Sequence, residues 1–115
     1  MVLAQMEPGG SPCFAVFHEG PNGRGASLER IGPEDVPRIR DLRYSDGGSL
    51  NTRVLSVTTG PGATLKLYDA SRYRAPMIEV LPSSRVNLAR PVMDSYQLRC
   101  ARLAAPAQPY RPQFK

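Results

Sequence analysis

Residues 64–79, TLKLYDASRYRAPMIE, decide the fold, because the same pattern is present earlier in the chain as residues 13–29, CFAVFHEGPNGRGASLE. Each copy has an apolar-polar stretch, a short turn and a second stretch that ends in glutamate. The aromatic residues Phe17 and Tyr68 are 51 positions apart, and the two final glutamates are 50 apart. Repetition at a fixed spacing is typical of an architecture built from similar units. The sequence therefore predicts two similar β-units that pack as one domain.

Polar and apolar residues alternate along the stretches that we expect to be strands. Leu65 and Leu67 alternate with Thr64 and Lys66, and residues 54–59 and 95–100 follow the same period of two. This period is typical of strands with one face on a core and the other toward solvent.

The best candidate for a helix covers residues 32–36. Gly32 would be its N-cap and Pro33 its first helical position. Pro37 limits this helix to about one turn. The predicted fold class is therefore all-β.

The chain of 115 residues supports one domain with an extended arm at each end. We expect an N-terminal arm over residues 1–12 and a core over residues 13–101. The core divides into a first motif, 13–59, and a second motif, 64–101. The C-terminal tail, 102–115, contains three prolines and cannot pair as a central strand.

The charge and the cysteine content indicate which kind of partner and which redox surroundings to expect. The net charge is +5, carried mainly by arginines spread along the chain, which favours an acidic partner surface. Cys13 and Cys100 are too few for a disulfide scaffold and lack the spacing of a metal site, so in a reducing cytosol we expect two small, buried, reduced side chains, while the sequence leaves their redox state open.

No apolar stretch reaches the length of a membrane span, and the first residues lack the pattern of a secretory signal. We therefore expect an intracellular protein, cytoplasmic or cytoskeletal, with no membrane partner.

The two halves resemble the Greek-key motifs of the βγ-crystallin family. That motif has an aromatic residue at the end of its first strand, a second aromatic five positions on, a glycine two further, then a serine-bearing strand and an acidic residue. The second half matches with Tyr68, Tyr73 and Glu79, and has Ala75 and Met77 in place of the glycine and the serine.

The first half of the chain matches the same motif less regularly. Phe17, Gly25, Ser27 and Glu29 agree with it, but one inserted residue is needed and the second aromatic is missing. The resemblance implies two Greek-key motifs packed as a βγ-crystallin-like sandwich, here with extended N- and C-terminal arms. Glycine in the folded hairpin would supply a positive φ without strain.

The resemblance also suggests calcium binding as a function. The family binds calcium with a six-residue pattern of two Asn/Asp, two variable positions, Ser/Thr and Ser. In the first half Asn51 and Ser56 match, whereas Thr52 and Leu55 do not. We align residues 92–97 of the second half with this pattern and find neither the opening Asn/Asp nor the closing serines. We expect no cofactor and no calcium. Any residual site would use Asn51 and Ser56, and a calcium-binding crystallin-like module is the alternative function.

Neither catalysis nor nucleic-acid binding is favoured. His18 follows Cys13 by five positions, which places the two on opposite faces of one strand and argues against a Cys–His dyad. We expect His18 to be a surface residue of the hairpin and the protein not to be an enzyme. Residues 72–74, Arg-Tyr-Arg, could stack on bases, but the tyrosines of the resembled fold are structural.

The tail offers the best partner-binding residues. Tyr110 and Phe114 alternate with the charged Arg111 and Lys115, and such aromatic and basic residues dominate interface hot spots. We therefore expect a non-enzymatic structural component of a large intracellular assembly that binds neighbouring subunits through its arms. The acidic lattice of a microtubule or ciliary axoneme is the favoured setting, and a viral shell is the second.

Overall fold

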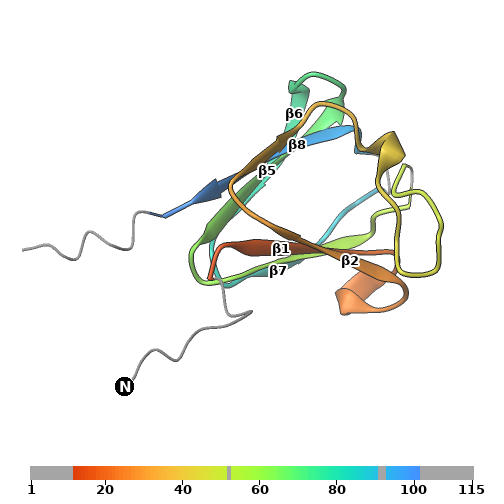
Figure 1. Ribbon diagram of the computed structural model, residues 1–115, viewed down its shortest axis with the longest axis horizontal. Helices are drawn as coiled ribbons and strands as arrows, with labels where there is room; N and C mark the ends of the chain where they lie inside the picture. Colours follow the sequence, from red (N-terminus) through yellow and green to blue (C-terminus); the bar gives the residue numbers. More distant parts are fainter. Residues whose placement is uncertain (1–11, 52, 91–92, 102–115) are drawn as a thin grey trace, which may run out of the picture.

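The computed structural model describes residues 12–51, 53–90 and 93–101, and it shows two four-stranded antiparallel sheets that face each other (Figure 1). The first sheet has the order β2-β1-β4-β7 and the second the order β3-β8-β5-β6. The predicted all-β Greek-key sandwich is thereby confirmed. Its strands are β1 (Phe14–His18), β2 (Ser27–Ile31), β3 (Glu34–Val36), β4 (Ser56–Thr59), β5 (Ala63–Ala70), β6 (Arg74–Val80), β7 (Arg85–Asn87) and β8 (Ser95–Cys100).

Each half of the chain contributes one strand to the sheet of the other half. β3 comes from the first half and pairs with β8 in the second sheet. β7 comes from the second half and pairs with β4 in the first sheet. Two short 3-10 turns, η2 (Pro21–Gly23) and η3 (Ile39–Asp41), lie in the connections. Because of this exchange, one edge strand of each sheet depends on the other half of the chain for its pairing.

The core lies between the two sheets and is formed by the inward residues of the alternating strands. Phe17 from β1 packs against Tyr96 from β8, with ring centroids 4.8 Å apart. Leu65, Leu67 and Leu98 are also fully or almost fully buried. The period of two in the sequence therefore identified the buried face of these strands correctly.

The segment for which we expected a helical turn, residues 32–36, contains strand β3 instead. Its pairing with β8 is strengthened by Glu34, whose carboxylate accepts hydrogen bonds from the Tyr96 hydroxyl (2.7 Å) and from the Arg30 guanidinium (2.5 Å at the shortest). Burial alone would raise the pKa of Glu34, but these donors hold it below its ordinary value. Tertiary partners therefore outweigh the local helix-start signals of Gly32 and Pro33.

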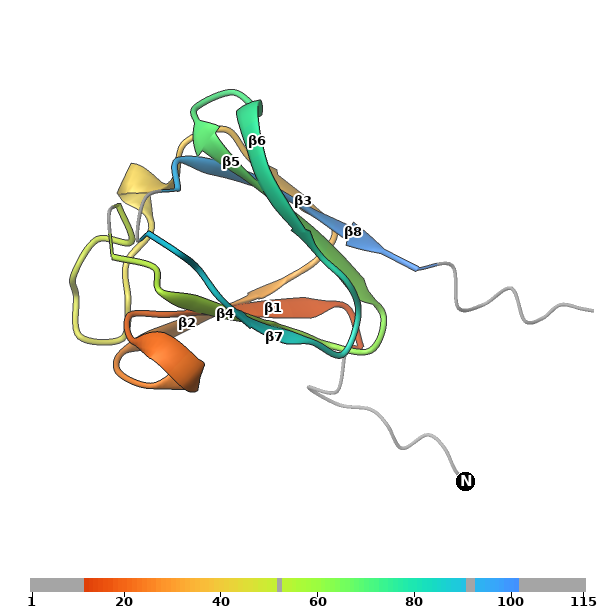
Figure 2. The same cartoon turned by 180° about the vertical axis from the view of Figure 1, so that it is seen from behind.

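The expectation of two reduced cysteines is wrong, because Cys13 and Cys100 form a disulfide. They are 87 positions apart in sequence, yet their Cα atoms lie 5.4 Å apart. Cys13 precedes β1 and Cys100 ends β8, and these strands are inner strands of the two facing sheets. Both views show the start of β1 and the end of β8 at the same side of the sandwich (Figure 1, Figure 2). Their spacing in the sequence gave no hint of this proximity.

One glycine holds both ends of the described chain. The Gly62 N–H donates to the Pro12 carbonyl (2.8 Å), and the Gly62 carbonyl accepts from the Ala101 N–H (2.8 Å). Gly62 lies in the connector between the two halves, next to the start of β5. The chain therefore enters and leaves the sandwich at one corner, where the disulfide is also located.

Candidate functional site

The two halves of the molecule repeat each other with an offset of 50 residues, which is visible in two buried serines. The Ser56 hydroxyl donates to the Gly20 carbonyl (2.7 Å) and accepts from the Gly23 N–H (2.9 Å). The Ser95 hydroxyl does the same with the Ala70 carbonyl (2.6 Å) and the Tyr73 N–H (3.0 Å). Each serine thus fastens the folded hairpin of its own half to the sandwich.

This offset corrects the alignment made from the sequence. Ser56 pairs with His18 and Ser95 pairs with Tyr68 in the strand registers, so Tyr68 corresponds to His18 and not to Phe17. No inserted residue is needed in the first half. Phe17 is a fully buried core residue, equivalent to Leu67.

Both hairpins fold over through the same left-handed backbone positions. Asn22 and Arg72 have φ values of 57° and 58°, and Gly23 and Tyr73 have 74° and 60°. Gly25 has φ of 80°, and Ala75 keeps the same conformation with φ of 56°. The replacement of glycine by Ala75 therefore did not change the hairpin, although left-handed backbone is strained for a residue with a Cβ.

Equivalent polar clusters cover the outer faces of the two sheets. The first outer cluster consists of His18, Thr58 and Arg85, and the second consists of Tyr68, Gln97 and Tyr73. In the first, His18 Nε2 lies 2.9 Å from Thr58 Oγ1. In the second, the Tyr68 hydroxyl lies 2.8 Å from Gln97 Oε1. These two hydrogen bonds occupy corresponding strand positions, so the repeat extends to the outer surface.

His18 is a buried residue, which corrects the prediction that it lies on the surface. Only 6% of it is exposed, and its Nδ1 has no hydrogen-bond partner among the residues that the structure describes. Burial lowers its pKa, and the nearby positive charge of Arg85 lowers it further. As predicted, His18 and Cys13 do not meet, because His18 points away from the core face that Cys13 and Phe17 share.

Arg85 covers the first hairpin. Its Nε donates to Thr58 Oγ1 (2.9 Å), and its guanidinium lies over Gly23, where an added Cβ would come within 2.7 Å of the guanidinium carbon. Beside it, Asn22 and Asn87 exchange two hydrogen bonds, at 2.8 Å and 3.0 Å. β7 is thus fixed to the hairpin of the other half, and a side chain at position 23 would displace the Arg85 guanidinium.

In the second outer cluster an aromatic pair takes the place of that guanidinium. The rings of Tyr68 and Tyr73 meet edge to face with centroids 5.8 Å apart. Partial burial raises the pKa of Tyr73, and the nearby carboxylate of Asp35 adds to the increase. These tyrosines pack on the sheet, which agrees with the structural role that the resemblance implied for them.

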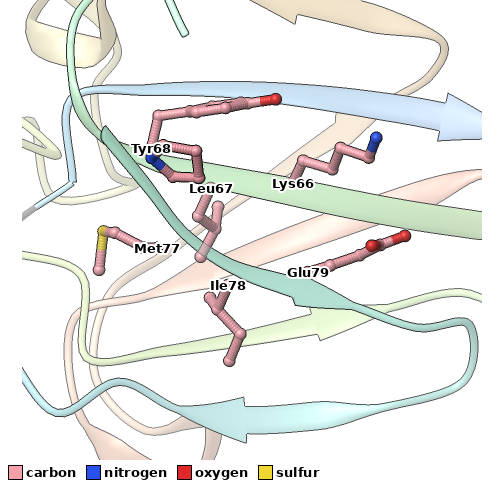
Figure 3. A pocket seen from close by; sticks show the side chains of 7 residues that line it. Lys66, Leu67, Tyr68, Met77, Ile78 and Glu79 are labelled. Atoms are coloured by element: carbon pink, nitrogen blue, oxygen red, sulfur yellow. The ribbon is translucent and has the colours of Figure 1, made fainter. Parts of the chain in front are cut away.

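A shallow hollow of about 390 Å³ lies beside the second cluster, between β5 and β6. Tyr68, Met77 and Ile78 contribute to its lining (Figure 3). Lys66 and Glu79 are direct cross-strand partners at its edge, yet no salt bridge within 4.0 Å joins them. The lining is mixed, with apolar Met77 and Ile78 beside charged Lys66 and Glu79, so the hollow offers surface for contact.

The segment considered for calcium, residues 51–56, contains a positively charged side chain, Arg53. Arg53 forms salt bridges with Glu19 and with Asp46, and its guanidinium carbon lies 5.3 Å from the centre of the Tyr44 ring. Arg53 therefore neutralises carboxylates that a metal ion would need. In the described ranges no group of three or more His, Cys, Asp or Glu side chains could hold a metal ion.

The two residues proposed as a residual calcium site have other roles. The Ser56 hydroxyl is engaged by the hairpin of Gly20 and Gly23. Asn51 is exposed, and its N–H donates to the Ser49 hydroxyl (3.1 Å). The alignment of residues 92–97 also needs correction, because Ser95, and not Gln97, corresponds to Ser56. A closing serine is thus present in the second half, preceded by Asp94.

The predicted partner-binding residues Tyr110, Arg111, Phe114 and Lys115 lie outside the described residues. Within the described part of the chain, no helix is long and apolar enough to cross a membrane. Sequence reasoning missed the disulfide, the Arg85 contact over Gly23 and the attachment of both chain ends to Gly62. The only available signal was the pair of cysteines at the two ends of the repeated region.

Comparison with known proteins identifies the fold. No family model matches the chain, and no curated protein matches it. Among the solved structures that match, three have TM-scores of 0.66, 0.62 and 0.60 and 21%, 18% and 16% identity. They are a structure concerned with the evolution of the eye lens βγ-crystallin domain fold, the N-terminal domain of Protein S, and a βγ-crystallin domain from Flavobacterium johnsoniae.

The matches cover most of each molecule. They span 78%, 76% and 75% of this chain, and 88%, 96% and 93% of the three matched chains in the same order. The resemblance inferred from the repeated motif is therefore confirmed at the level of the fold, which is that of a βγ-crystallin domain.

Proposed function

We propose that the chain is a non-enzymatic structural module that joins neighbouring protein subunits in a large assembly, with its arms as the attachments. The observation that carries the proposal is the common corner at which the chain enters and leaves the sandwich. Pro12 and Ala101 both bond to Gly62, and the disulfide of Cys13 and Cys100 lies beside them. Two segments that start at one fixed point can act on a neighbour as a single bipartite anchor.

The composition of the arms supports the same function. Residues 102–115 contain Arg102, Arg111 and Lys115 and no acidic residue, so the tail is cationic where it starts at this corner. Charge of one sign speeds association with a surface of the other sign, while inserted aromatics slow dissociation. An acidic protein surface is therefore the partner that this arrangement fits.

Two settings suit such a module. The lattice of a microtubule or axoneme presents an acidic surface to a chain with charge +5, and a viral shell would use the sandwich as a compact spacer. The disulfide favours the second kind of setting, because disulfides persist in oxidising surroundings and are rare in the cytosol. An intracellular location stays a prediction. The redox state of the two cysteines in native material would test it.

Calcium binding is the second candidate function, and it would use the same fold as a sensor module. Asp94 directly before Ser95 is the feature that favours it, since a carboxylate and a hydroxyl are suitable oxygen ligands. The salt bridges of Arg53 weigh against it in the first half.

Deletion of residues 103–115 tests the role of the tail. We expect the deletion variant to keep the folded sandwich and to lose binding to the assembly, measured as co-sedimentation with microtubules polymerised from purified tubulin. Native-like thermal unfolding is the control for folding. Unchanged co-sedimentation would exclude the tail as the attachment, and no binding by the full chain would exclude the microtubule lattice.

Single substitutions separate the contribution of the aromatic residues of the tail to binding from that of its charged residues. Tyr110→Ala and Phe114→Ala should each weaken binding by roughly thirtyfold, mainly through faster dissociation, if these residues are hot spots. Neutralising Arg111 and Lys115 should instead slow association and reduce its dependence on salt. Ile78→Ser is a matched control, because Ile78 is an exposed apolar residue of the sandwich, 37% accessible, on edge strand β6.

A further inference from the structure

We infer that the disulfide of Cys13 and Cys100 is a redox-controlled clasp on the two chain ends. When oxidised, it holds the first and last residues of the sandwich together at one corner. When reduced, it leaves those ends to backbone hydrogen bonds alone, so that the corner loosens while the two sheets stay folded. This inference does not depend on what the arms bind.

Among the described residues, backbone hydrogen bonds hold the rest of this corner, including those of the Phe14–Ile31 and Ala63–Cys100 strand pairs and the one from the Gly60 N–H to the Phe14 carbonyl (2.9 Å). The Pro12 carbonyl and the Ala101 N–H each bond to Gly62, and the Cys13 carbonyl accepts from the Gly32 N–H (2.9 Å). Single hydrogen bonds near a chain end open readily, because local opening at the ends of a domain requires little free energy. The disulfide is the one covalent link between the corner's two strands, β1 and β8, in the described residues.

The connection between β2 and β3 packs directly on the bond. A Cβ added at Gly32 would lie 2.8 Å from the sulfur of Cys13 and 3.1 Å from that of Cys100. Gly32 therefore leaves the space that the disulfide occupies. Release of the clasp should reach this connection as well as the chain ends.

The rest of the sandwich is also held by contacts that do not involve the clasp. β3 and β7 cross between the halves, and the aromatic contact of Phe17 with Tyr96 joins the two sheets. Ser56 and Ser95 fasten the two hairpins at the end of β1 and the start of β8, opposite the disulfide corner. Reduction should therefore lower the stability of the whole domain and, in addition, loosen the corner more than the rest of the sandwich.

The chemical step is thiol–disulfide exchange with a dithiol reductant. Cys100 is only partly buried, whereas Cys13 is 6% exposed, so we assign the first attack to the sulfur of Cys100. A thiolate of the reductant bonds to that sulfur, and Cys13 leaves as a thiolate that takes up a proton. The second thiol of the reductant then closes its own disulfide and frees Cys100. The protein gains two electrons and two protons, and the dithiol loses them.

Amide hydrogen exchange on the full chain, with and without dithiothreitol, tests the inference. The reporting amides are those of Gly32, Gly62 and Ala101, which donate the hydrogen bonds of the corner. The control amides are those of Glu19 and Asp94, which donate to Ala26 and Tyr68 (2.9 Å each) at the opposite end of β1 and β8. We expect protection at the corner to fall at least about tenfold more than at the controls.

A Cys13→Ala/Cys100→Ala variant provides the matched comparison. It should show the loosened corner without reductant and should not respond to dithiothreitol. Loss of protection by the same factor at all five amides would show that the bond only stabilises the whole domain. If thiol titration confirms that the disulfide is reduced and the protection is nevertheless unchanged, the chain ends are held without the disulfide. Failure of dithiothreitol to reduce the folded protein would exclude redox control. Each of these three results would overturn the inference.

Discussion

Ser56 and Ser95 make the same two hydrogen bonds in the two halves of the molecule, with partners one repeat of 50 positions apart in sequence. Ser56 binds Gly20 and Gly23, and Ser95 binds Ala70 and Tyr73, so the partners are related by 50 positions in both cases. The serines themselves are only 39 positions apart, because the connection before β4 is longer than that before β8. The folded hairpin, and not the chain length between strands, is thus the repeated element.

Replacement of either serine should destabilise the domain. Ser56→Ala or Ser95→Ala leaves a partly buried carbonyl and a partly buried N–H without their partner, and we expect each to cost about 1–3 kcal/mol of unfolding free energy. Denaturant unfolding measures the change. Ser84→Ala is the control, because its exposed hydroxyl donates to the nearby Pro82 carbonyl (3.1 Å), and the cost should stay within about 0.5 kcal/mol. Equal effects of all three substitutions would contradict the fastening role.

The left-handed position shared by Gly25 and Ala75 predicts opposite effects of exchanging their residue types. Ala75→Gly removes the strain of a Cβ at φ of 56° and should stabilise the domain by about 0.5–1 kcal/mol. Gly25→Ala should cost about 1–2 kcal/mol, since its Cβ would lie 3.3 Å from the Glu19 Cβ at φ of 80°. Thermal unfolding of both variants checks the signs, and destabilisation by Ala75→Gly would refute the argument.

His18 should make stability depend on pH. Its pKa in the folded state is below the ordinary value of 6.5, first because of burial and then because of Arg85. The unfolded chain therefore takes up the proton first, so stability is full above pH 6.5 and declines as the pH falls from there toward the folded pKa. One proton limits the slope to about 1.4 kcal/mol per pH unit.

The variant His18→Tyr tests this prediction, because it copies the tyrosine found at the equivalent position 68. Urea unfolding at several pH values between neutral and 5 should show the decline in the natural chain and a flatter dependence in the variant. Glu34 acts in a lower window, since its depressed pKa removes stability only as the pH falls below 4.5. Identical profiles for both chains would mean that His18 makes no contribution.

Removal of the disulfide should cause the largest single loss of stability. A cross-link between positions 87 apart is worth about 4–5 kcal/mol in the chain-entropy treatment, which counts only its effect on the unfolded state. We expect the Cys13→Ala/Cys100→Ala variant to unfold at a lower temperature than the oxidised chain. Scanning calorimetry of the oxidised chain, the reduced chain and the variant measures the difference. A loss below about 1 kcal/mol would contradict the prediction.

Calcium should bind weakly or not at all. Arg53 pairs with Glu19 and Asp46, so a calcium ion near Asn51 would face a fixed positive charge. Isothermal titration with calcium chloride should give no dissociation constant below about 100 µM, a value between those of sensors and extracellular modules. Tighter binding would favour the sensor module over the structural module.

The sequence by itself determined the fold class and the strands that carry the core. Alternation of period two in β5 and β8 is a local property, and burial of one face follows from it directly. The repeat indicated two motifs, and its glycine, aromatic and acidic positions indicated the Greek-key fold. The predicted alignment of the first motif with the second was wrong by one residue. Phe17 resembles Tyr68 in residue type, whereas His18 occupies the position that corresponds to Tyr68 in the structure.

Only the tertiary structure decided which distant residues meet. Cys13 and Cys100 pair because the inner strands of two facing sheets bring the chain ends together, and Glu34 joins a strand because Tyr96 and Arg30 donate to it. Arg85 reaches the cluster of His18 and Thr58 from the other half. Each of these contacts joins segments whose separation in sequence carries no information about their distance. Local patterns therefore determined the elements, and the crossing of strands between the sheets determined the sites.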